Sequence, residues 1–276
     1  MKFILNSVEY NLPERVLLMA ILNVTPDSFS DGGKYKHIQA LDTFLKQCEH
    51  DKVDIIDIGG ESSRPGAQPV SEEEELNRVL PAIEYISARV STPISIDTYK
   101  ASVAEKSLQR GASIVNDISG GCADKQMFKT VAAYNAPYIL MHMKGTPRNM
   151  QQNPTYTDII HEMEDFFLNQ IKMAEAAGIK QIVLDPGIGF GKTFEHNYYL
   201  LNHLSSFLNL EKPLLIGASR KRFLAGEQNY TADQREEQTL VVHTQAILNG
   251  ARIIRTHNTH MGRKMIDTCQ QLLLNR

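Results

Sequence analysis

The stretch Met19–Gly33, MAILNVTPDSFSDGG, sets the pattern that the rest of the chain repeats. It begins inside an apolar run, residues 16–22, which is short enough for one buried strand. At Asn23 the character changes to Thr, Pro, Asp, Ser and a Gly pair, with Phe29 as the large apolar residue. A Pro just after a strand and a Gly pair further on predict a long loop, residues 23–35. Long loops that leave a rigid strand are often binding loops.

Size and composition exclude several classes of protein. The chain has 276 residues, 42% of them hydrophobic and 22% charged, with a formal net charge of −3, which is ordinary for a globular protein with a sizeable core. Without a basic face, general nucleic-acid binding is not expected. Three widely spaced cysteines suggest neither disulfides nor a zinc site. No run reaches the ~20 apolar residues that span a bilayer, and no signal-peptide pattern begins the chain, so we expect a cytoplasmic protein without a membrane partner.

A strand-and-helix pattern recurs along the whole chain. Residues 1–12 read as a β-hairpin, and eight strand-like runs follow, each with a helical pattern behind it. The runs end near Asn23, Asp57, Asp97, Asn116, His142, Asp185, Ser219 and Arg255. This spacing is typical of βα repeats of about 30 residues. We therefore predict one domain over residues 1–276, an α/β protein with a (β/α)8 TIM barrel and an N-terminal β-hairpin. A doubly wound open sheet is the alternative, but no GxGxxG follows the first strand.

Signals at the predicted helix ends agree with this repeat. Residues 71–74 (SEEE) and 231–234 (TADQ) have the spacing of a capping box, which starts a helix. Gly111, Gly178 and Gly250 each stand just before a strand, where a helix C-cap glycine belongs.

In such a barrel, every strand brings its C-terminal end to one face, where active sites lie. One group of strand-end residues, Asp97, Asn116 and Asp185, matches a flat heterocycle whose edge carries adjacent N–H donors. Lys221 is placed to donate to a ring carbonyl and to keep a neighbouring Asp ionised. A strand-end Asp is as often a helix N-cap, so the prediction depends on these residues occurring together.

A second group suits an oligophosphate. It contains Arg255, His257 and the Gly- and Ser-rich segment 59–66 (GGESSRPG) with Arg64, which offer cations and backbone N–H groups. We also predict a Mg²⁺ ion with one protein ligand, Asn23, because Mg²⁺ usually completes its coordination with phosphate oxygens and water.

Two motifs have less specific patterns. The segment 186–192 (PGIGFGK) lacks the spacing of a phosphate loop, so we interpret it as a Gly-rich wall whose backbone approaches the planar ring. His257 and His260 are spaced like a metal pair, but we predict no site there because no third ligand lies nearby in the sequence.

Eight motifs together resemble those of dihydropteroate synthases. They lie in order between about residues 17 and 258 and read NVTPDSFSDGG, GGESSRPG, SIDTYK, VNDISGG, MHMKGTPRNMQ, LDPGIGFGK, GASRK and RTH. The resemblance implies a transferase of folate biosynthesis that condenses 6-hydroxymethyl-7,8-dihydropterin diphosphate with p-aminobenzoate. Diphosphate would leave a pterin methylene cation, which the arylamine would attack. The resemblance also implies Mg²⁺, a homodimer and sulfonamide binding.

The resemblance further implies a role for each matching residue. The pterin site would consist of Asp97, Asn116, Met141, Asp185, Phe190 and Lys221. The diphosphate site would consist of Ser63, Arg255, Thr256 and His257, and Mg²⁺ would bind Asn23. The aminobenzoate would lie among Phe29, Ser63, Arg64 and Pro65. The expected catalytic residues are Lys221, Arg255 and His257.

Three positions depart from the family pattern, and two other functions remain open. Ser63 replaces the usual Thr, Arg222 replaces a frequent Ser after Lys221, and Asn258 replaces a common Asp. One alternative is a pterin barrel that transfers a methyl group from a methylated folate to a corrinoid, but such proteins lack the phosphate side. The other is a non-catalytic pterin-binding barrel, which would need a broken loop or anion site.

Overall fold

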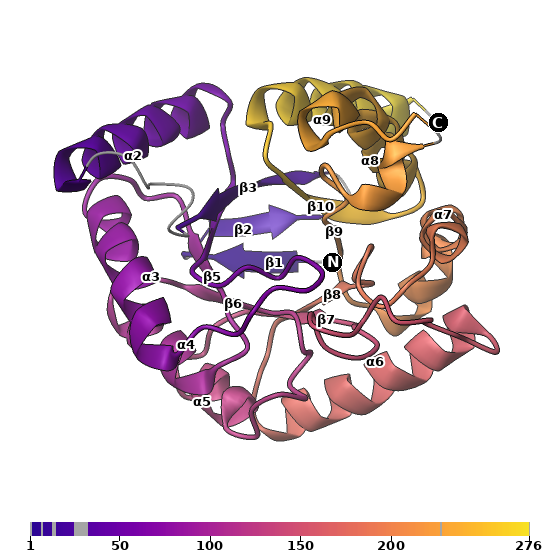
Figure 1. The fold of residues 1–276 in the computed structure, drawn as a ribbon, viewed down its shortest axis with the longest axis horizontal. Coiled ribbons are helices and arrows are strands. Elements are labelled where there is room, and N and C mark those ends of the chain that lie inside the picture. The colour runs from indigo at the N-terminus through magenta and orange to yellow at the C-terminus, as the bar shows by residue number, and fades with distance from the viewer. Residues whose placement is uncertain (1, 7, 13–14, 25–32, 227, 276) are drawn as a thin grey trace.

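In the computed structural model, which describes residues 2–6, 8–12, 15–24, 33–226 and 228–275, eight parallel strands close into a barrel. The strands follow chain order, and the last pairs with the first, Ile254 lying opposite Leu18 (Figure 1). The barrel strands are β3 (Leu17–Asn23), β4 (Ile55–Gly59), β5 (Ile94–Asp97), β6 (Ile114–Asp117), β7 (Tyr138–Met141), β8 (Ile182–Asp185), β9 (Leu214–Ile216) and β10 (Ala251–Thr256). Both the predicted barrel and the N-terminal hairpin, β1 (Lys2–Leu5) with β2 (Val8–Asn11), are confirmed.

Helices surround the barrel and connect its strands (Figure 1). They are α2 (Gly33–His50), α3 (Glu72–Ser87), α4 (Ala101–Gln109), α5 (Met127–Ala133), α6 (Ile159–Ala176), α7 (Phe194–Asn202), α8 (Glu236–Leu248) and α9 (Thr259–Leu274). Three short 3₁₀ helices are η1 (Leu204–Leu210), η2 (Arg222–Ala225) and η3 (Ala232–Arg235). In the described part of the chain, none of these is long and apolar enough to cross a membrane.

The predicted helix-end signals are present. Ser71 Oγ accepts the backbone N–H of Glu74 at 3.2 Å, so Ser71 is the N-cap of α3. Gln234 Oε1 accepts the backbone N–H of Thr231 at 3.0 Å at the start of η3, which leads into α8. The predicted C-cap glycines all have positive φ: Gly111, Gly178 and Gly250. Local sequence therefore fixes where several helices begin and end.

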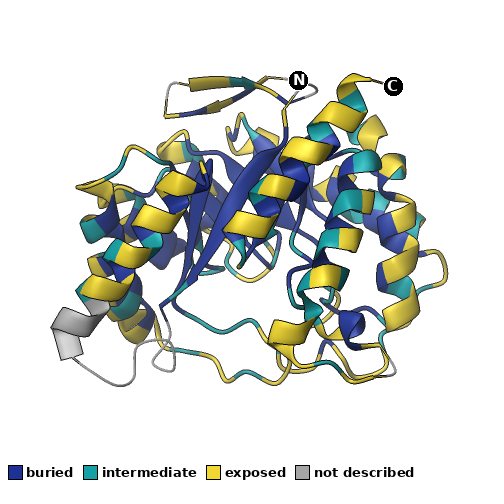
Figure 2. Cartoon of the chain, turned by 90° about the horizontal axis from the view of Figure 1, so that it is seen from above, coloured by how far each residue is buried: buried dark blue, intermediate teal, exposed yellow. Residues whose placement is uncertain are grey.

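The hairpin lies across the N-terminal end of the barrel (Figure 2). Its buried residues Phe3 and Leu5, with Leu12, pack on apolar side chains inside the barrel. Those interior residues are Leu17, Met19, Ile55, Ile114, Ile139, Val183, Leu215 and Ile253. Gln181 fixes the hairpin further, since its side chain accepts from Ile4 N at 2.7 Å and donates to Ile4 O at 3.1 Å. This end of the barrel is therefore filled and closed.

One strand, β4, extends further toward the C-terminal end of the barrel than the sequence suggests. β4 continues past Asp57 to Gly59, which pairs with Asn23 on one side and Asp97 on the other. Asp57 thus lies below the rim, inside the barrel, and is fully buried. A carboxylate at that depth needs partners, because burying an unpaired charge is costly.

Candidate active site

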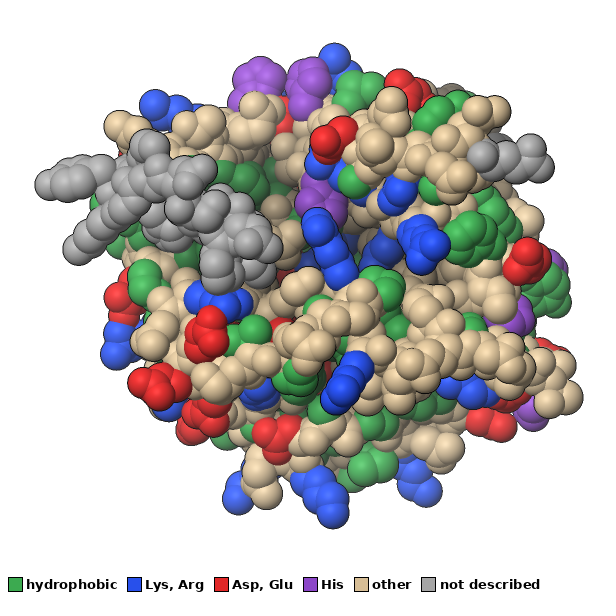
Figure 3. All heavy atoms as spheres, viewed as in Figure 1, with side chains coloured by type: hydrophobic (Ala, Val, Ile, Leu, Met, Phe, Trp, Pro, Cys, Tyr) green, Lys and Arg blue, Asp and Glu red, His purple; other side chains and the backbone are tan. Residues whose placement is uncertain are grey.

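The C-terminal end of the barrel faces the viewer in Figure 3, where Lys and Arg side chains surround a central hollow. At the base of this end, Arg255 of β10 binds two carboxylates. Its Nε donates to Asp57 Oδ2 at 2.6 Å and its Nη2 donates to Asp97 Oδ2 at 2.8 Å. Asp57 also accepts from Asn116 Nδ2 at 3.2 Å. One buried carboxylate therefore positions both a predicted pterin residue and a predicted diphosphate residue.

Two predicted pterin carboxylates have raised pKa values. Burial raises the pKa of Asp97 to about 7, with Asp57 adding to the rise and Arg255 opposing it. Burial raises the pKa of Asp185 to about 6, against the hydrogen bond that its Oδ1 accepts from Gly187 N at 2.7 Å. Groups that titrate near neutral pH can either accept or donate a hydrogen bond at the edge of a heterocycle.

Lys221 lies beside these carboxylates. Burial, followed by the charge of Arg255, lowers the pKa of Lys221 to about 8, while Asp185 and Asp97 oppose this shift. Its Nζ lies 3.9 Å from the centre of the Phe190 ring, a cation–π contact. The chain reaches this position through Arg220, a non-glycine residue with φ of 58°. That rarely adopted conformation, which costs energy, sets the direction of Lys221.

An apolar wall stands next to the charged groups. Met141 and Phe190 are buried and pack with Ile118 and Met150, and Tyr99 and Met143 cover the cluster. Both predicted pterin-lining residues therefore belong to one apolar cluster at the end of β7 and after β8.

At two glycines of residues 186–192 the structure shows a reason for glycine that involves no ligand, and the interpretation of this segment as a wall beside the ring stays a prediction. A Cβ on Gly187 would lie 2.0 Å from His142 O, and one on Gly191 would lie 2.2 Å from Lys144 O. These glycines are needed because the backbone of residues 142–144 fills the space beside them. Sequence alone could not distinguish a close approach of backbone from a close approach of ligand.

Lys192 is a buried residue to which the sequence analysis gave no role. Its Nζ donates to Phe190 O at 2.9 Å and lies 3.1 Å from His142 Nδ1. Burial lowers the pKa of Lys192 to about 7, and Asp185 opposes that shift. Lys192 thus ties the segment that carries Phe190 to the segment after β7. The sequence signal for this role was the presence of a charged residue in an otherwise Gly-rich and apolar motif.

Two of the predicted diphosphate residues, Thr256 at the end of β10 and His257 just after it, contact Ser219, which follows β9. Ser219 Oγ lies 3.0 Å from His257 Nδ1, accepts the backbone N–H of His257 at 3.2 Å and lies 3.3 Å from Thr256 Oγ1. Partial burial and then the cations Arg255, Arg220, Lys221 and Arg64 lower the pKa of His257. Thr256 is buried, so its side chain supports Ser219 in this structure.

The segment 63–69 lies at the rim without helix or strand structure. Ser63 is half-buried, whereas Arg64 and Pro65 are exposed. The backbone N–H of Gly66 donates to Pro147 O at 3.1 Å, which joins this segment to the one after β7. Arg64 is close enough to contribute to the lowered pKa values of Lys221 and His257. Phe29 and most of the predicted 23–35 loop lie outside the described residues.

Asn23 ends β3 beside the Asp97 carboxylate. A Cβ on Gly59 would lie 3.7 Å from Asn23 Oδ1 and 3.7 Å from Asp97 Oδ2, so two oxygens flank one small residue. Two oxygen donors fit Mg²⁺, which usually takes few protein ligands.

Two residues that differ from the family pattern, Arg222 and Asn258, do not disturb the site. Arg222 is exposed, and Asn258 caps α9 by accepting the N–H of Met261 at 3.1 Å.

The barrel and the rim together define a class of protein. Residues 19–257 match the model of the pterin binding enzyme family. The chain therefore belongs to the pterin binding enzymes, as the carboxylates beside an apolar wall suggest.

Within that class the most similar curated relatives include dihydropteroate synthases, and this chain is a transferase of the dihydropteroate synthase type. It is 43% identical to dihydropteroate synthase of Bacillus subtilis over 94% of this chain and 90% of that protein. It is 42% identical to the Escherichia coli K12 protein of that name over 87% of this chain and 86% of that protein. Its structure matches Yersinia pestis dihydropteroate synthase in a sulfonamide complex with a TM-score of 0.89 and 39% identity, over 99% of both chains. It also matches the Xanthomonas albilineans enzyme with 4-aminobenzoic acid at a TM-score of 0.89 and 36% identity, over 98% of this chain and 97% of that one.

Proposed function

We propose that the rim condenses 6-hydroxymethyl-7,8-dihydropterin diphosphate with p-aminobenzoate to give 7,8-dihydropteroate and diphosphate, in folate biosynthesis. The observation that carries the assignment of residues is the bridge that Arg255 makes between Asp57 and Asp97. This bridge supports the proposal because it joins a cation suited to diphosphate, Arg255, to a carboxylate suited to the pterin edge, Asp97. A binding site for pterin alone would not need that juxtaposition.

The pterin ring lies against Met141 and Phe190 in this proposal. Asp185 and Asn116 bind its polar edge, since a buried carboxylate and an amide match adjacent N–H donors. Lys221, held over Phe190, donates to the ring carbonyl. Asp97 completes the set at the rim, close to the methylene carbon that reacts.

The diphosphate binds Arg255, His257, Ser63 and the backbone at Thr256. Its negative charge raises the pKa of His257 again, so that the imidazole becomes a second cation on the leaving group. Asn23 would hold Mg²⁺, which when bound would neutralise further charge on diphosphate oxygens.

The reaction follows from this placement of charge. The bond between the methylene carbon and the diphosphate oxygen breaks, and its electron pair leaves with diphosphate. The dihydropterin delocalises the resulting cation, and the lone pair of the arylamine forms the new C–N bond before the amine releases a proton. Phe29, Ser63, Arg64 and Pro65 position the aminobenzoate. Positioning of the two substrates contributes up to roughly 7–11 kcal/mol in favourable cases, and loop closure excludes water.

A homodimer in the cytoplasm completes the proposal. Phe194, Tyr198 and Tyr199 of α7 are 45–48% exposed, and Val241 of the neighbouring α8 is 68% exposed. Large apolar residues gathered on adjacent elements often mark an interface, and two-fold dimers are the commonest assembly. Sedimentation equilibrium of the full chain tests the dimer, and a monomer at micromolar concentration would contradict it.

The decisive experiment is to measure diphosphate release from the dihydropterin diphosphate with Mg²⁺, with and without p-aminobenzoate. Release coupled to formation of dihydropteroate is the expected result. Pterin binding without release would favour the non-catalytic barrel, and turnover of methyltetrahydrofolate would favour methyl transfer. Asp185→Asn is the matched variant: it keeps the side-chain shape and is expected to abolish pterin binding while circular dichroism stays unchanged.

A further inference from the structure

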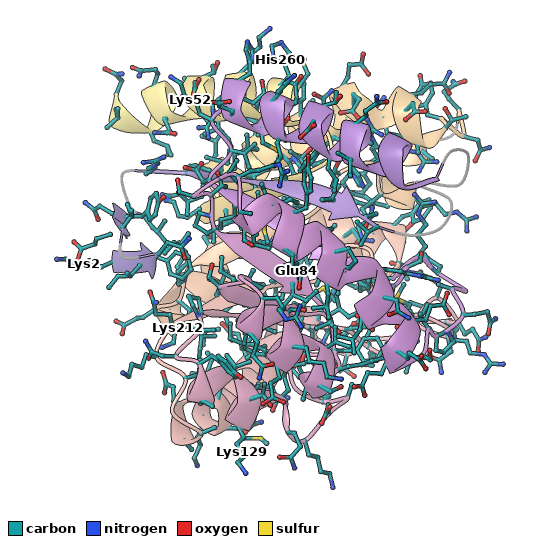
Figure 4. The ribbon with its side chains drawn as sticks, turned by 90° about the vertical axis from the view of Figure 1, so that its left-hand side faces the viewer. Lys2, Lys52, Glu84, Lys129, Lys212 and His260 are labelled. Atoms are coloured by element: carbon teal, nitrogen blue, oxygen red, sulfur yellow. The ribbon has the colours of Figure 1, made fainter. Side chains whose placement is uncertain are left out.

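A group of metal-ligating side chains lies outside the active site, on the outer surface where α2 ends and α9 begins. It consists of His50, Asp51 and His260, whose ligand atoms all lie within 4.8 Å of one another. Figure 4 shows His260 beside α2 on this surface, with Lys52 further toward the hairpin. The third ligand that the sequence did not offer to His260 therefore comes from a segment about two hundred residues away. His257 is not part of the group.

The two spacings to Asp51 in this group match those of ligands around one tetrahedral ion. Asp51 Oδ1 lies 3.0 Å from His50 Nδ1 and 3.3 Å from His260 Nδ1. Zinc bonds of about 2.0–2.1 Å in tetrahedral geometry place neighbouring ligand atoms about 3.3 Å apart. The two imidazole rings are 6.0 Å apart between centroids and tilted by 37°. Both ring nitrogens therefore already point at the same carboxylate oxygen.

The carboxylate is held in place from its other side. Asp51 Oδ2 accepts hydrogen bonds from Gln47 Nε2 at 2.7 Å and from Thr259 Oγ1 at 2.5 Å. Supporting hydrogen bonds of this kind orient metal ligands and raise affinity. Asp51 itself is 2% exposed, whereas the side chains of His50 and His260 are 73% and 47% exposed. Asp51 is thus held in place by the protein, whereas the two histidine side chains are accessible to solvent.

The surrounding charges permit a cation. Arg263 lies close, donating from Nε to Asp51 O at 3.1 Å, and its guanidinium pairs with Asp267 at 3.5 Å and with Asp54 at 2.9 Å, which it shares with Arg15. The C-terminal end of α2 favours a positive charge and the N-terminal end of α9 disfavours one, so the two helix dipoles oppose each other.

We propose that His50, Asp51 and His260 form a binding site for one Zn²⁺ ion, with its fourth coordination position open to water. Two imidazoles and one carboxylate are a donor set for zinc and not for Mg²⁺, which prefers oxygen. The ion would replace the hydrogen bonds that now join the rings to Asp51 and would link α2 to α9. It is a different site from the one at Asn23, with different ligands on a different surface.

Cobalt titration of the full chain tests the proposal. Tag-free protein stripped with EDTA is titrated with Co²⁺, whose tetrahedral complexes absorb in the visible, and Zn²⁺ is then added as the competitor. We expect one equivalent of Co²⁺ to bind and Zn²⁺ to remove the band. His50→Gln and His260→Gln should each weaken binding about tenfold or more, and Gln47→Leu should weaken it with all ligands intact.

The matched control is His161→Gln. His161 of α6 also faces a carboxylate, Asp165 at 3.7 Å, but both are exposed and the pair belongs to one helix. This variant should bind Co²⁺ like the parent chain. No visible band in the parent chain, or a band that survives both His50→Gln and His260→Gln, would overturn the proposal and leave the group as a hydrogen-bonded tie between helices.

Discussion

The two ends of the barrel are built by the same strands and each contains fully buried side chains, yet they hold opposite chemistry. At the N-terminal end, Phe3 and Leu12 are 2% and 0% exposed and touch apolar side chains. At the C-terminal end, Asp57 is 0% exposed and is paired with Arg255. Loss of a side chain leaves a cavity at the first end and an uncompensated charge at the second. Burial alone therefore does not distinguish residues that stabilise the fold from residues that serve the site. The type of partner, apolar or charged, does distinguish them.

The largest effect is expected from Arg255→Ala. This change removes a cation from the leaving group and should lower kcat by about 10²–10³-fold. It also leaves Asp57 buried without a counter-charge, which should cost about 3–5 kcal/mol of unfolding free energy. Steady-state kinetics and urea unfolding measure the two effects.

The double variant Asp57→Asn with Arg255→Ala separates those effects. It should restore the part of the stability that the unpaired Asp57 costs and none of the activity, while Asp97 still lacks its partner. If activity returned together with stability, Arg255 would be a structural residue and the two ends of the barrel would not differ as described.

Phe3→Ala at the closed end should show the reverse pattern. The cavity should lower the unfolding free energy by about 3–5 kcal/mol, because Phe3 is buried between the hairpin and the barrel. At a temperature where the variant is folded, kcat and KM should match those of the parent chain. A changed KM would mean that the two ends are coupled.

Asp185→Asn should change how stability depends on pH. Burial raises the pKa of Asp185 from 3.8 to about 6, so the folded chain holds this proton more tightly than the unfolded chain does. Stability from this group is present below about pH 4 and is lost as pH rises to about 6. Asn does not ionise, so the variant should gain on the order of 2–3 kcal/mol relative to the parent over that window. Urea unfolding at several pH values checks this, and a difference that does not vary with pH would contradict the shift.

The smallest effects come from two matched glutamines. Gln181 binds the backbone of Ile4 at the closed end, and Gln151 donates to Gly189 O at 2.8 Å at the open end. Gln181→Ala should cost about 1 kcal/mol of stability with no change in kinetics. Gln151→Ala should raise KM for the pterin, because Gly189 precedes Phe190. Equal changes of KM in both variants would contradict the proposed difference between the closed and open ends of the barrel.

Much of the fold could be predicted because its signals are local. The alternation of apolar runs with capped helices gave the barrel, and residues 71–74 and Gly111 lie at helix ends as predicted. The strand-end rule also brought Asp97, Asn116 and Arg255 to one place, since parallel strands in a barrel share an end.

What sequence reasoning missed depends on contacts between distant segments. Asp57 was recognised as a strand end, but its pairing with Arg255 joins residues 198 apart. Lys192 was placed in a glycine motif, although one of its backbone partners, His142 O at 3.4 Å, belongs to the segment after β7. The carboxylate beside His260 likewise comes from a distant residue, Asp51, which directly follows α2. No local pattern encodes such neighbours, and only the closed barrel reveals them.

The position of Arg255 has a consequence for selectivity between ligands. In this structure its guanidinium already donates from Nε to Asp57 and from Nη2 to Asp97. A small polyanion such as inorganic diphosphate must therefore compete with two built-in carboxylates, at least one of them deeply buried, to reach the cation. A molecule that also donates hydrogen bonds to Asp97 binds this carboxylate itself, so that Asp97 no longer competes for Arg255. We therefore expect a lone polyanion to bind more weakly than one that is attached to a pterin.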